Sequence, residues 1–157
     1  MKSNADSANV RVPPPLLYLG ALLLTVSVSN MLGLDGLGVG RPLRLIIGLP
    51  LLAGGMISTA SARGLFRKMG TNVPPWQPAT LLVTDGMFRW SRNPMYLGLT
   101  LAYAGLAIVF DSSLALLFLP VVLLIMRTQV IAKEELYLEA KFGADYRAYK
   151  ARVRRWV

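Results

Sequence analysis

The sequence predicts an all-α integral membrane protein with about four transmembrane helices, the last two of which form a C-terminal hairpin. Three observations support this fold class. Hydrophobic residues make up 54% of the 157-residue chain, more than an ordinary soluble domain of this length carries. The apolar residues gather in four long runs that shorter polar stretches separate. Lys and Arg are concentrated in polar segments that would all lie on one side of a membrane.

The first two predicted spans cover residues 16–34 and 43–62. The first follows three consecutive prolines, carries no charge, and is close to the roughly 20 residues that cross a bilayer. A turn-rich stretch separates it from the second span, which contains Pro50 and the pair Gly54-Gly55. Such residues are common in membrane helices, and we expect them to serve helix packing or a kink.

The third and fourth predicted spans, residues 94–110 and 113–132, are joined by a tight turn and should form an antiparallel hairpin. Both are short for a full crossing, and the fourth reaches 132 only because the long side chain of Arg127 can extend to the interface. Asn93 and Pro94 are expected to be the N-cap and the first residue of the third helix.

A long loop and a basic tail complete the predicted fold. The loop covers residues 63–91, and irregular loops of this length are usually functional. The tail, residues 133–157, has Phe142, Tyr146 and Tyr149 at helical spacing among many cations. We expect it to be an amphipathic helix that lies on the membrane surface beneath the loop.

The distribution of cations predicts the topology. Of the 17 Lys and Arg, only Arg41 and Arg44 lie on the side opposite the termini and the long loop. The positive-inside rule then places both termini and the loop in the cytoplasm, with the chain in a bacterial-type inner membrane. We expect one domain, residues 1–157, in contact with membrane lipids. The net charge of +9 is explained by topology and by anionic head groups, and we expect no nucleic-acid partner.

The composition excludes several kinds of chemistry. The chain has no Cys and no His, which removes disulfides, thiol nucleophiles and imidazole catalysis, and we expect no metal site. A small transporter is disfavoured because the spans carry no charges other than boundary cations. The sequence does not indicate an oligomeric state.

Two features remain that topology does not explain. One is the corner at which the loop enters the third helix, where a helix N-terminus and Arg92 would together attract an anion. The other is the pair Glu134-Glu135, which has no cation at helical spacing. Two interpretations stay open. The carboxylates either form a structural ion pair with Arg89 or Arg92, or they hold a cationic ligand. The rings that could face such a cation are those of Phe88, Trp90 and Tyr96.

The same residues resemble the signature of the isoprenylcysteine carboxyl methyltransferase family. That signature is a Leu-Val-Thr-x-Gly-x-Tyr run and then Arg-His-Pro-x-Tyr, similar to residues 82–96 here. Its second half, Glu-Glu and then Phe-Gly-x-x-Tyr-x-x-Tyr, is matched by Glu134-Glu135 and residues 142–149. The resemblance covers about residues 81–153. Phospholipid methyltransferases share this core more loosely.

The resemblance implies an enzyme that binds S-adenosylmethionine. The residues expected to bind this cofactor are Leu81, Leu82, Val83, Phe88, Arg92, Asn93, Pro94, Tyr96, Glu134 and Glu135. Asn93 stands where the family has His, and Phe88 where it has Tyr, so no base can act at position 93. Methyl transfer from a sulfonium releases a neutral group and does not require a base there. Arg127 is a candidate for contacting an anionic acceptor.

We therefore expect methyl transfer from S-adenosylmethionine to a lipophilic or small carboxylate, thiol or amine acceptor at the cytoplasmic membrane face. The alternative is a non-catalytic membrane assembly or sensor protein that retains the fold. The missing His favours that alternative, whereas the presence of Arg92 and both glutamates favours the enzyme.

Overall fold

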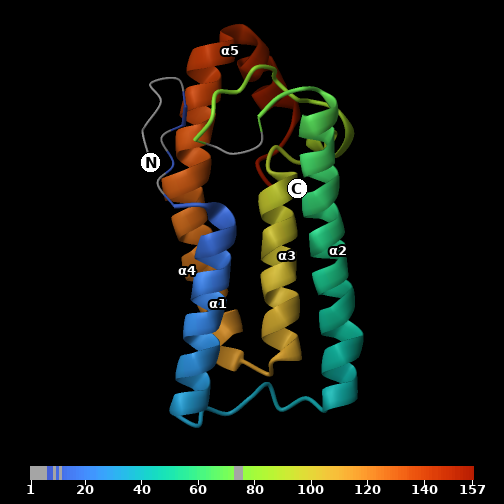
Figure 1. Cartoon of the computed structure of the whole chain (residues 1–157), viewed down its shortest axis with the longest axis vertical. Helices are drawn as coiled ribbons and strands as arrows, with labels where there is room; N and C mark the ends of the chain where they lie inside the picture. Colours follow the sequence, from blue (N-terminus) through green and yellow to red (C-terminus); the bar gives the residue numbers. More distant parts are fainter. Residues whose placement is uncertain (1–6, 9, 11, 73–75) are drawn as a thin grey trace.

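The computed structural model describes residues 7, 8, 10, 12–72 and 76–157. These residues form helices and loops and no strand, which confirms the predicted all-α fold class. The helices are α1 (Pro14–Met31), α2 (Arg41–Lys68), α3 (Pro94–Val109), α4 (Ser113–Ile125) and α5 (Ala132–Arg152) (Figure 1). A π-helical segment, Met126–Ile131, joins α4 to α5.

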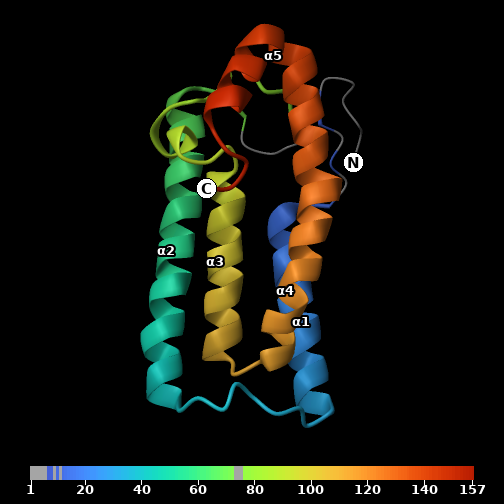
Figure 2. The ribbon, with the colours of Figure 1, turned by 180° about the vertical axis from the view of Figure 1, so that it is seen from behind.

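The long helices run side by side in one bundle (Figures 1 and 2). Three of them are long and apolar enough to cross a membrane, namely α1, α2 and the rod formed by α4 and α5. The fourth, α3, has 16 residues and is also apolar. The chain is therefore an integral membrane protein.

Proline and glycine mark the helix boundaries. A proline in the first turn starts α1, α2 and α3, where a missing N–H leaves no hydrogen bond unmade. Gly33 and Gly70 follow α1 and α2 with φ of 60° and 71°, the left-handed conformation that commonly ends a helix. The turn before α4 is closed by Ser112, whose side chain accepts a hydrogen bond from the backbone N–H of Ala115.

Helices α1 and α2 differ at their boundaries from the predicted spans. Helix α1 begins and ends a few residues earlier than residues 16–34. Helix α2 continues to Lys68, so that Arg63 and Arg67 belong to the helix and not to the loop. This extension is stabilised because cations in the last turn complement the helix dipole, and because Phe66 packs beneath the loop.

Glycines bring α2 and α3 into backbone contact. A Cβ atom on Gly98 would lie 2.6 Å from the carbonyl oxygen of Gly55, so neither position has room for a side chain. Small residues allow such close packing between membrane helices. The hydroxyl of Ser58 adds a hydrogen bond to the carbonyl of Pro94 at 3.1 Å. Gly55 thus serves helix packing, whereas its neighbour Gly54 faces open space.

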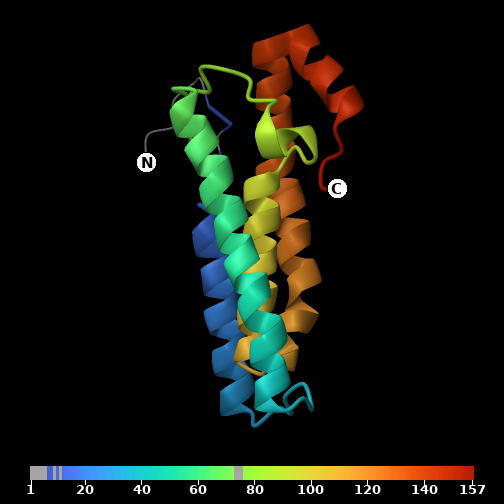
Figure 3. The same ribbon diagram turned by 90° about the vertical axis from the view of Figure 1, so that its right-hand side faces the viewer.

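The tail is a bent helix and not a single straight one. Gly143, with φ 52° and ψ −117°, interrupts α5, and the chain turns back toward the bundle (Figure 3). After α5, residues 153–157 form a C-terminal strap that runs to the start of α3 (Figures 1 and 2). Tyr146 and Tyr149 pack against Val83 and Phe88, which confirms that the tail lies beneath the loop.

Candidate functional site

The C-terminal strap covers the corner at which the loop enters α3. The backbone N–H of Arg92 donates to the carbonyl of Arg154 at 3.0 Å. Asn93 occupies the predicted N-cap position, but its side chain makes no capping hydrogen bond. Instead its amide donates to the carbonyl of Arg155 at 2.9 Å. Asn93 therefore links the strap to the start of α3 by a hydrogen bond. The contact is possible because the bend at Gly143 returns the strap to this corner.

Glu135 lies at the centre of a buried ion cluster. It is 7% exposed, and its carboxylate receives two hydrogen bonds from Arg155, Nε at 3.0 Å and Nη2 at 2.6 Å. Nη1 of Arg92 lies 3.1 Å from the same carboxylate. The structural ion pair that the sequence left open thus forms at Glu135, with Arg92. Arg89 pairs with Asp85 at the surface instead.

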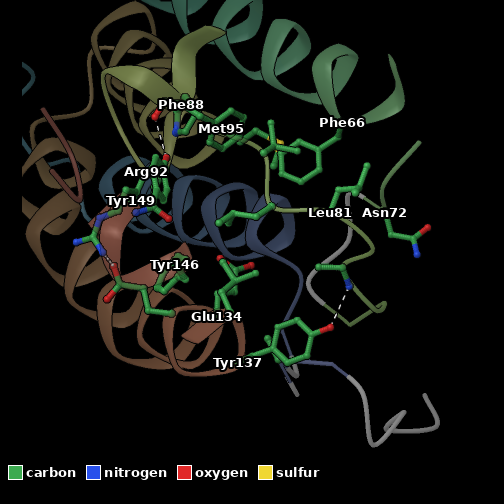
Figure 4. Close-up of a pocket in the computed structure, with 18 of the residues that line it drawn as sticks. Phe66, Asn72, Leu81, Phe88, Arg92, Met95, Glu134, Tyr137, Tyr146 and Tyr149 are labelled. Carbon is green, nitrogen blue, oxygen red and sulfur yellow. Dashed lines mark hydrogen bonds and ion pairs between the residues drawn. The ribbon is translucent and has the colours of Figure 1, made fainter. Parts of the chain in front are cut away.

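Glu134 also lines the neighbouring pocket (Figure 4), but it makes a different contact from Glu135. The hydroxyl of Tyr96 donates a hydrogen bond to its Oε1. Loss of solvation raises the pKa of Glu134 to about 7, the hydrogen bond from Tyr96 opposes this rise, and the charge of Glu135 adds to it. A cation placed in the pocket would therefore favour the ionised carboxylate.

The pocket lies between the loop, the start of α3, and α5. Its enclosed volume is about 110 Å³. The residues that the sequence predicts to bind the cofactor all line it, namely Leu81, Leu82, Val83, Phe88, Arg92, Asn93, Pro94, Tyr96, Glu134 and Glu135. Segments about 40 residues apart in the chain therefore meet here, as the two halves of the motif require.

Aromatic side chains hold the pocket walls together. Tyr149 donates a hydrogen bond to the carbonyl of Phe88 at 2.8 Å, and Phe66 meets Phe88 edge to face at 5.2 Å between ring centres. Burial raises the pKa of Tyr146 to about 12, so that its hydroxyl stays neutral at physiological pH. Trp90, one of the three rings that could face a bound cation, is 80% exposed and is not among the residues lining the pocket. It points outward because the 3-10 helix Gly86–Arg89 turns Phe88 inward.

Arg127 lies away from this pocket. It is exposed on the π-helical segment and lines a separate groove with Leu124 and Trp156. Among the described residues, this groove shares none with the pocket. The structure therefore does not bring Arg127 together with the other predicted residues.

Sequence reasoning missed several residues of the site. Phe66 could have been found, because the apolar pattern of α2 continues past Ala62 at helical spacing. Tyr137, whose hydroxyl accepts a hydrogen bond from the backbone of Ala79, lies three positions after Glu134 on α5. Arg155 had no local signal, since its contact with Glu135 depends on the bend at Gly143.

Comparison with known proteins places the chain among membrane methyltransferases. The sequence model of the phospholipid methyltransferase family matches residues 43–145. An uncharacterized protein of Haemophilus influenzae is 44% identical over 63 residues, which are 40% of this chain and all of that protein. The protein-S-isoprenylcysteine O-methyltransferase of Schizosaccharomyces pombe is 34% identical over 73 residues, 46% of this chain and 31% of that enzyme. No solved structure matches significantly.

Proposed function

This chain belongs to the phospholipid methyltransferase family, and we propose that it transfers a methyl group from S-adenosylmethionine to a lipophilic or small acceptor at the cytoplasmic membrane face. The acceptor atom would belong to a carboxylate, a thiol or an amine. One observation carries the proposal: both halves of the methyltransferase-like motif line a single pocket, into which Glu134 projects (Figure 4).

The chemistry of the pocket fits the cofactor. Glu134 would face the ammonium or the ribose hydroxyls, and its tendency to ionise beside a cation favours a positively charged ligand. Nε of Arg92 is buried and has no hydrogen-bond partner among the described residues, so it could donate to a carboxylate, whereas Nη1 of Arg92 already lies against Glu135. Leu81, Leu82 and Val83 offer an apolar wall to the adenine.

The size of the pocket sets a condition on binding. Small-molecule sites usually enclose about 300–1,000 Å³, and this pocket encloses about 110 Å³. A ligand as large as S-adenosylmethionine therefore requires the walls to separate. One of the hydrogen bonds that hold the loop wall runs from the backbone N–H of Ala79 to the hydroxyl of Tyr137.

When bound, S-adenosylmethionine supplies a methyl group on a cationic sulfur. The chain would contribute alignment and exclusion of water, which can account for much of a rate acceleration. Tyr96 would hold the carboxylate of Glu134 in place. Asn93, bonded to the strap, would keep the start of α3 in position.

The positions of the charged residues support one orientation of the protein in the membrane. The pocket and the described parts of both terminal segments lie at one end of the bundle (Figure 1). Arg41 and Arg44 begin α2 at the opposite end. The positive-inside rule then supports a cytoplasmic pocket and cytoplasmic termini in a bacterial-type inner membrane.

Calorimetric titration of the detergent-purified protein with S-adenosylmethionine tests the cofactor site. Glu134→Gln removes the charge and keeps the shape, and we expect affinity to fall about 10- to 100-fold, as for the loss of one hydrogen bond to a charged group. Glu139→Gln is the matched control, because Glu139 lies on the same helix and pairs with Lys150. Absence of binding to folded wild-type protein would refute the proposal.

Catalysis needs a second measurement. Membrane extracts supplied with a donor that carries a labelled methyl group should yield a labelled product with wild-type protein, and much less with Glu134→Gln. Binding without any transfer would instead support the non-catalytic alternative.

A further inference from the structure

We propose that Tyr18 of α1 is a positioning residue of the cofactor site. It acts through Thr100 on Tyr96, and Tyr96 in turn holds the carboxylate of Glu134. The proposal rests on the methyltransferase function proposed above. It extends the site to a helix that lies outside residues 43–145, the part of the chain that the family model matches.

A chain of hydrogen bonds leads from Tyr18 to the first turn of α3. The hydroxyl oxygens of Tyr18 and Thr100 are 2.8 Å apart, and the hydroxyl of Thr100 donates to the carbonyl of Tyr96 at 2.8 Å. Because a threonine hydroxyl has one proton, Tyr18 is the donor to Thr100. Successive hydrogen bonds of this kind polarise and strengthen one another. Loss of the Tyr18 hydroxyl therefore weakens the restraint on Tyr96.

Tyr96 connects this chain of bonds to the pocket. Its hydroxyl donates to Oε1 of Glu134, so its position fixes that of the carboxylate. Tyr96 and Glu134 line the pocket, whereas Tyr18 and Thr100 do not. Tyr18 therefore acts through other residues and makes no contact with a ligand in the pocket.

The N-terminal part of the chain packs closely around this end of the site. Tyr18 is 4% exposed and belongs to the same buried cluster as Tyr96. Ala8 and Val10, which precede α1, are buried in that cluster too, and Ala8 lines the pocket. The contact of the N-terminal region with the site thus has a second observation that does not depend on Tyr18.

The alternative is that Tyr18 serves helix packing alone, and Tyr103 is the matched control for it. The rings of the two tyrosines meet edge to face at 6.1 Å between centres. The hydroxyl of Tyr103 is also buried, and it donates to the carbonyl of Ala115 on α4 at 3.0 Å. Neither Tyr103 nor Ala115 lines the pocket. Tyr18→Phe and Tyr103→Phe each remove one buried hydroxyl and keep the ring, so only a positioning role distinguishes them at the pocket.

The titration of Glu134 gives a readout that needs no cofactor. The chain has three glutamates, Glu134, Glu135 and Glu139, so few signals appear when glutamate is isotope-labelled at its carboxyl carbon. Magnetic resonance of the detergent-purified protein then follows each carboxyl with pH, and Glu134→Gln identifies one signal by its disappearance. Burial raises the pKa of Glu134 to about 7 and the bond from Tyr96 opposes this rise, so a loosened Tyr96 raises the pKa further.

The surroundings of Glu134 stay constant when the hydroxyl of Tyr18 is removed. The other charged or titratable side chains that line the pocket precede α3 or belong to α3 and α5, namely Arg92, Tyr96, Glu135, Tyr137, Tyr146 and Tyr149. Tyr18→Phe and Tyr103→Phe retain all of them. A shift confined to Tyr18→Phe is therefore transmitted through the chain of bonds.

We expect the titration midpoint of Glu134 to rise by about half a pH unit in Tyr18→Phe and by about one to two units in Tyr96→Phe, which loses the bond to the carboxylate itself. Thr100→Val interrupts the same chain at its middle and should match Tyr18→Phe. The double variant should shift no further than either one, because the two hydroxyls act in series. Tyr103→Phe should leave the midpoint unchanged. Equal midpoints in Tyr18→Phe and Tyr103→Phe, or additive shifts in the double variant, would overturn the proposal.

Calorimetry with S-adenosylmethionine separates this role from the methyltransferase proposal. At pH 7 the affinity of Tyr18→Phe should be about two-fold below that of wild type, because a smaller fraction of Glu134 is ionised, and Tyr103→Phe should bind as wild type does. If wild-type protein fails to bind while the midpoint still shifts, the methyltransferase proposal fails and the role of Tyr18 toward the cofactor fails with it. If the cofactor binds and the midpoint does not shift, only the role of Tyr18 is refuted.

Discussion

Replacing Arg155 by Ala tests whether the C-terminal strap holds the site together. Arg155 donates two hydrogen bonds to Glu135, at 3.0 and 2.6 Å, and Glu135 is 7% exposed. Hydrogen bonds to charged groups contribute about 1.5–3 kcal/mol, and breaking a buried ion pair outright costs about 3–5 kcal/mol. Arg92 remains beside the carboxylate, and Arg155 itself is 29% exposed, so we expect a loss near the lower figure, about 2 kcal/mol.

A loss of that size should lower the midpoint of thermal unfolding by about 4–8 °C, measured in detergent by circular dichroism. Arg154→Ala is the matched control, since its side chain is exposed and its carbonyl still receives the bond from Arg92. Arg155→Lys keeps the positive charge but not the planar group that donates two hydrogen bonds. Its unfolding midpoint should therefore lie between those of Arg155→Ala and Arg154→Ala. Equal melting of the Arg155→Ala and Arg154→Ala variants would refute the reasoning that the strap is fastened through Glu135.

Two further predictions concern the pocket and the bundle. Because burial raises the pKa of Glu134 to about 7, and a cationic ligand prefers the ionised carboxylate, affinity for S-adenosylmethionine should weaken as the pH falls below 7. Calorimetry at several pH values should show this pH dependence of the affinity in wild type and not in Glu134→Gln. A pH dependence that persists in the variant would assign the titration to another group. Gly55→Ala should destabilise the bundle by about 1–3 kcal/mol, because its Cβ would collide with the backbone of α3. Gly54→Ala should be neutral or mildly stabilising, since no atom lies within 4 Å of its added Cβ, and equal unfolding midpoints for the two variants would contradict this packing.

Much of the site could be predicted because its residues come in two short motifs at helix starts. Pro94 marks the start of α3 by its own covalent geometry, and Glu134-Glu135 follow the last apolar run. What could not be predicted is how the two glutamates divide their roles. On a helix they point in different directions, and only the positions of Tyr96 and Arg155 decide which carboxylate pairs with arginine and which accepts a hydrogen bond from tyrosine.

The sequence by itself determined the membrane class, the helical fold and the motif residues, because apolar length, proline position and charge distribution act locally along the chain. The tertiary structure decided the contacts that form only because the chain reverses its direction. The bend at Gly143 returns the strap to the start of α3. There the side chain of Asn93 bonds to the strap instead of capping the helix, and Arg155 reaches the carboxylate of Glu135. The tertiary structure also separated Arg127 from the pocket. Such contacts join residues far apart in the chain, and no local pattern records which of them will meet.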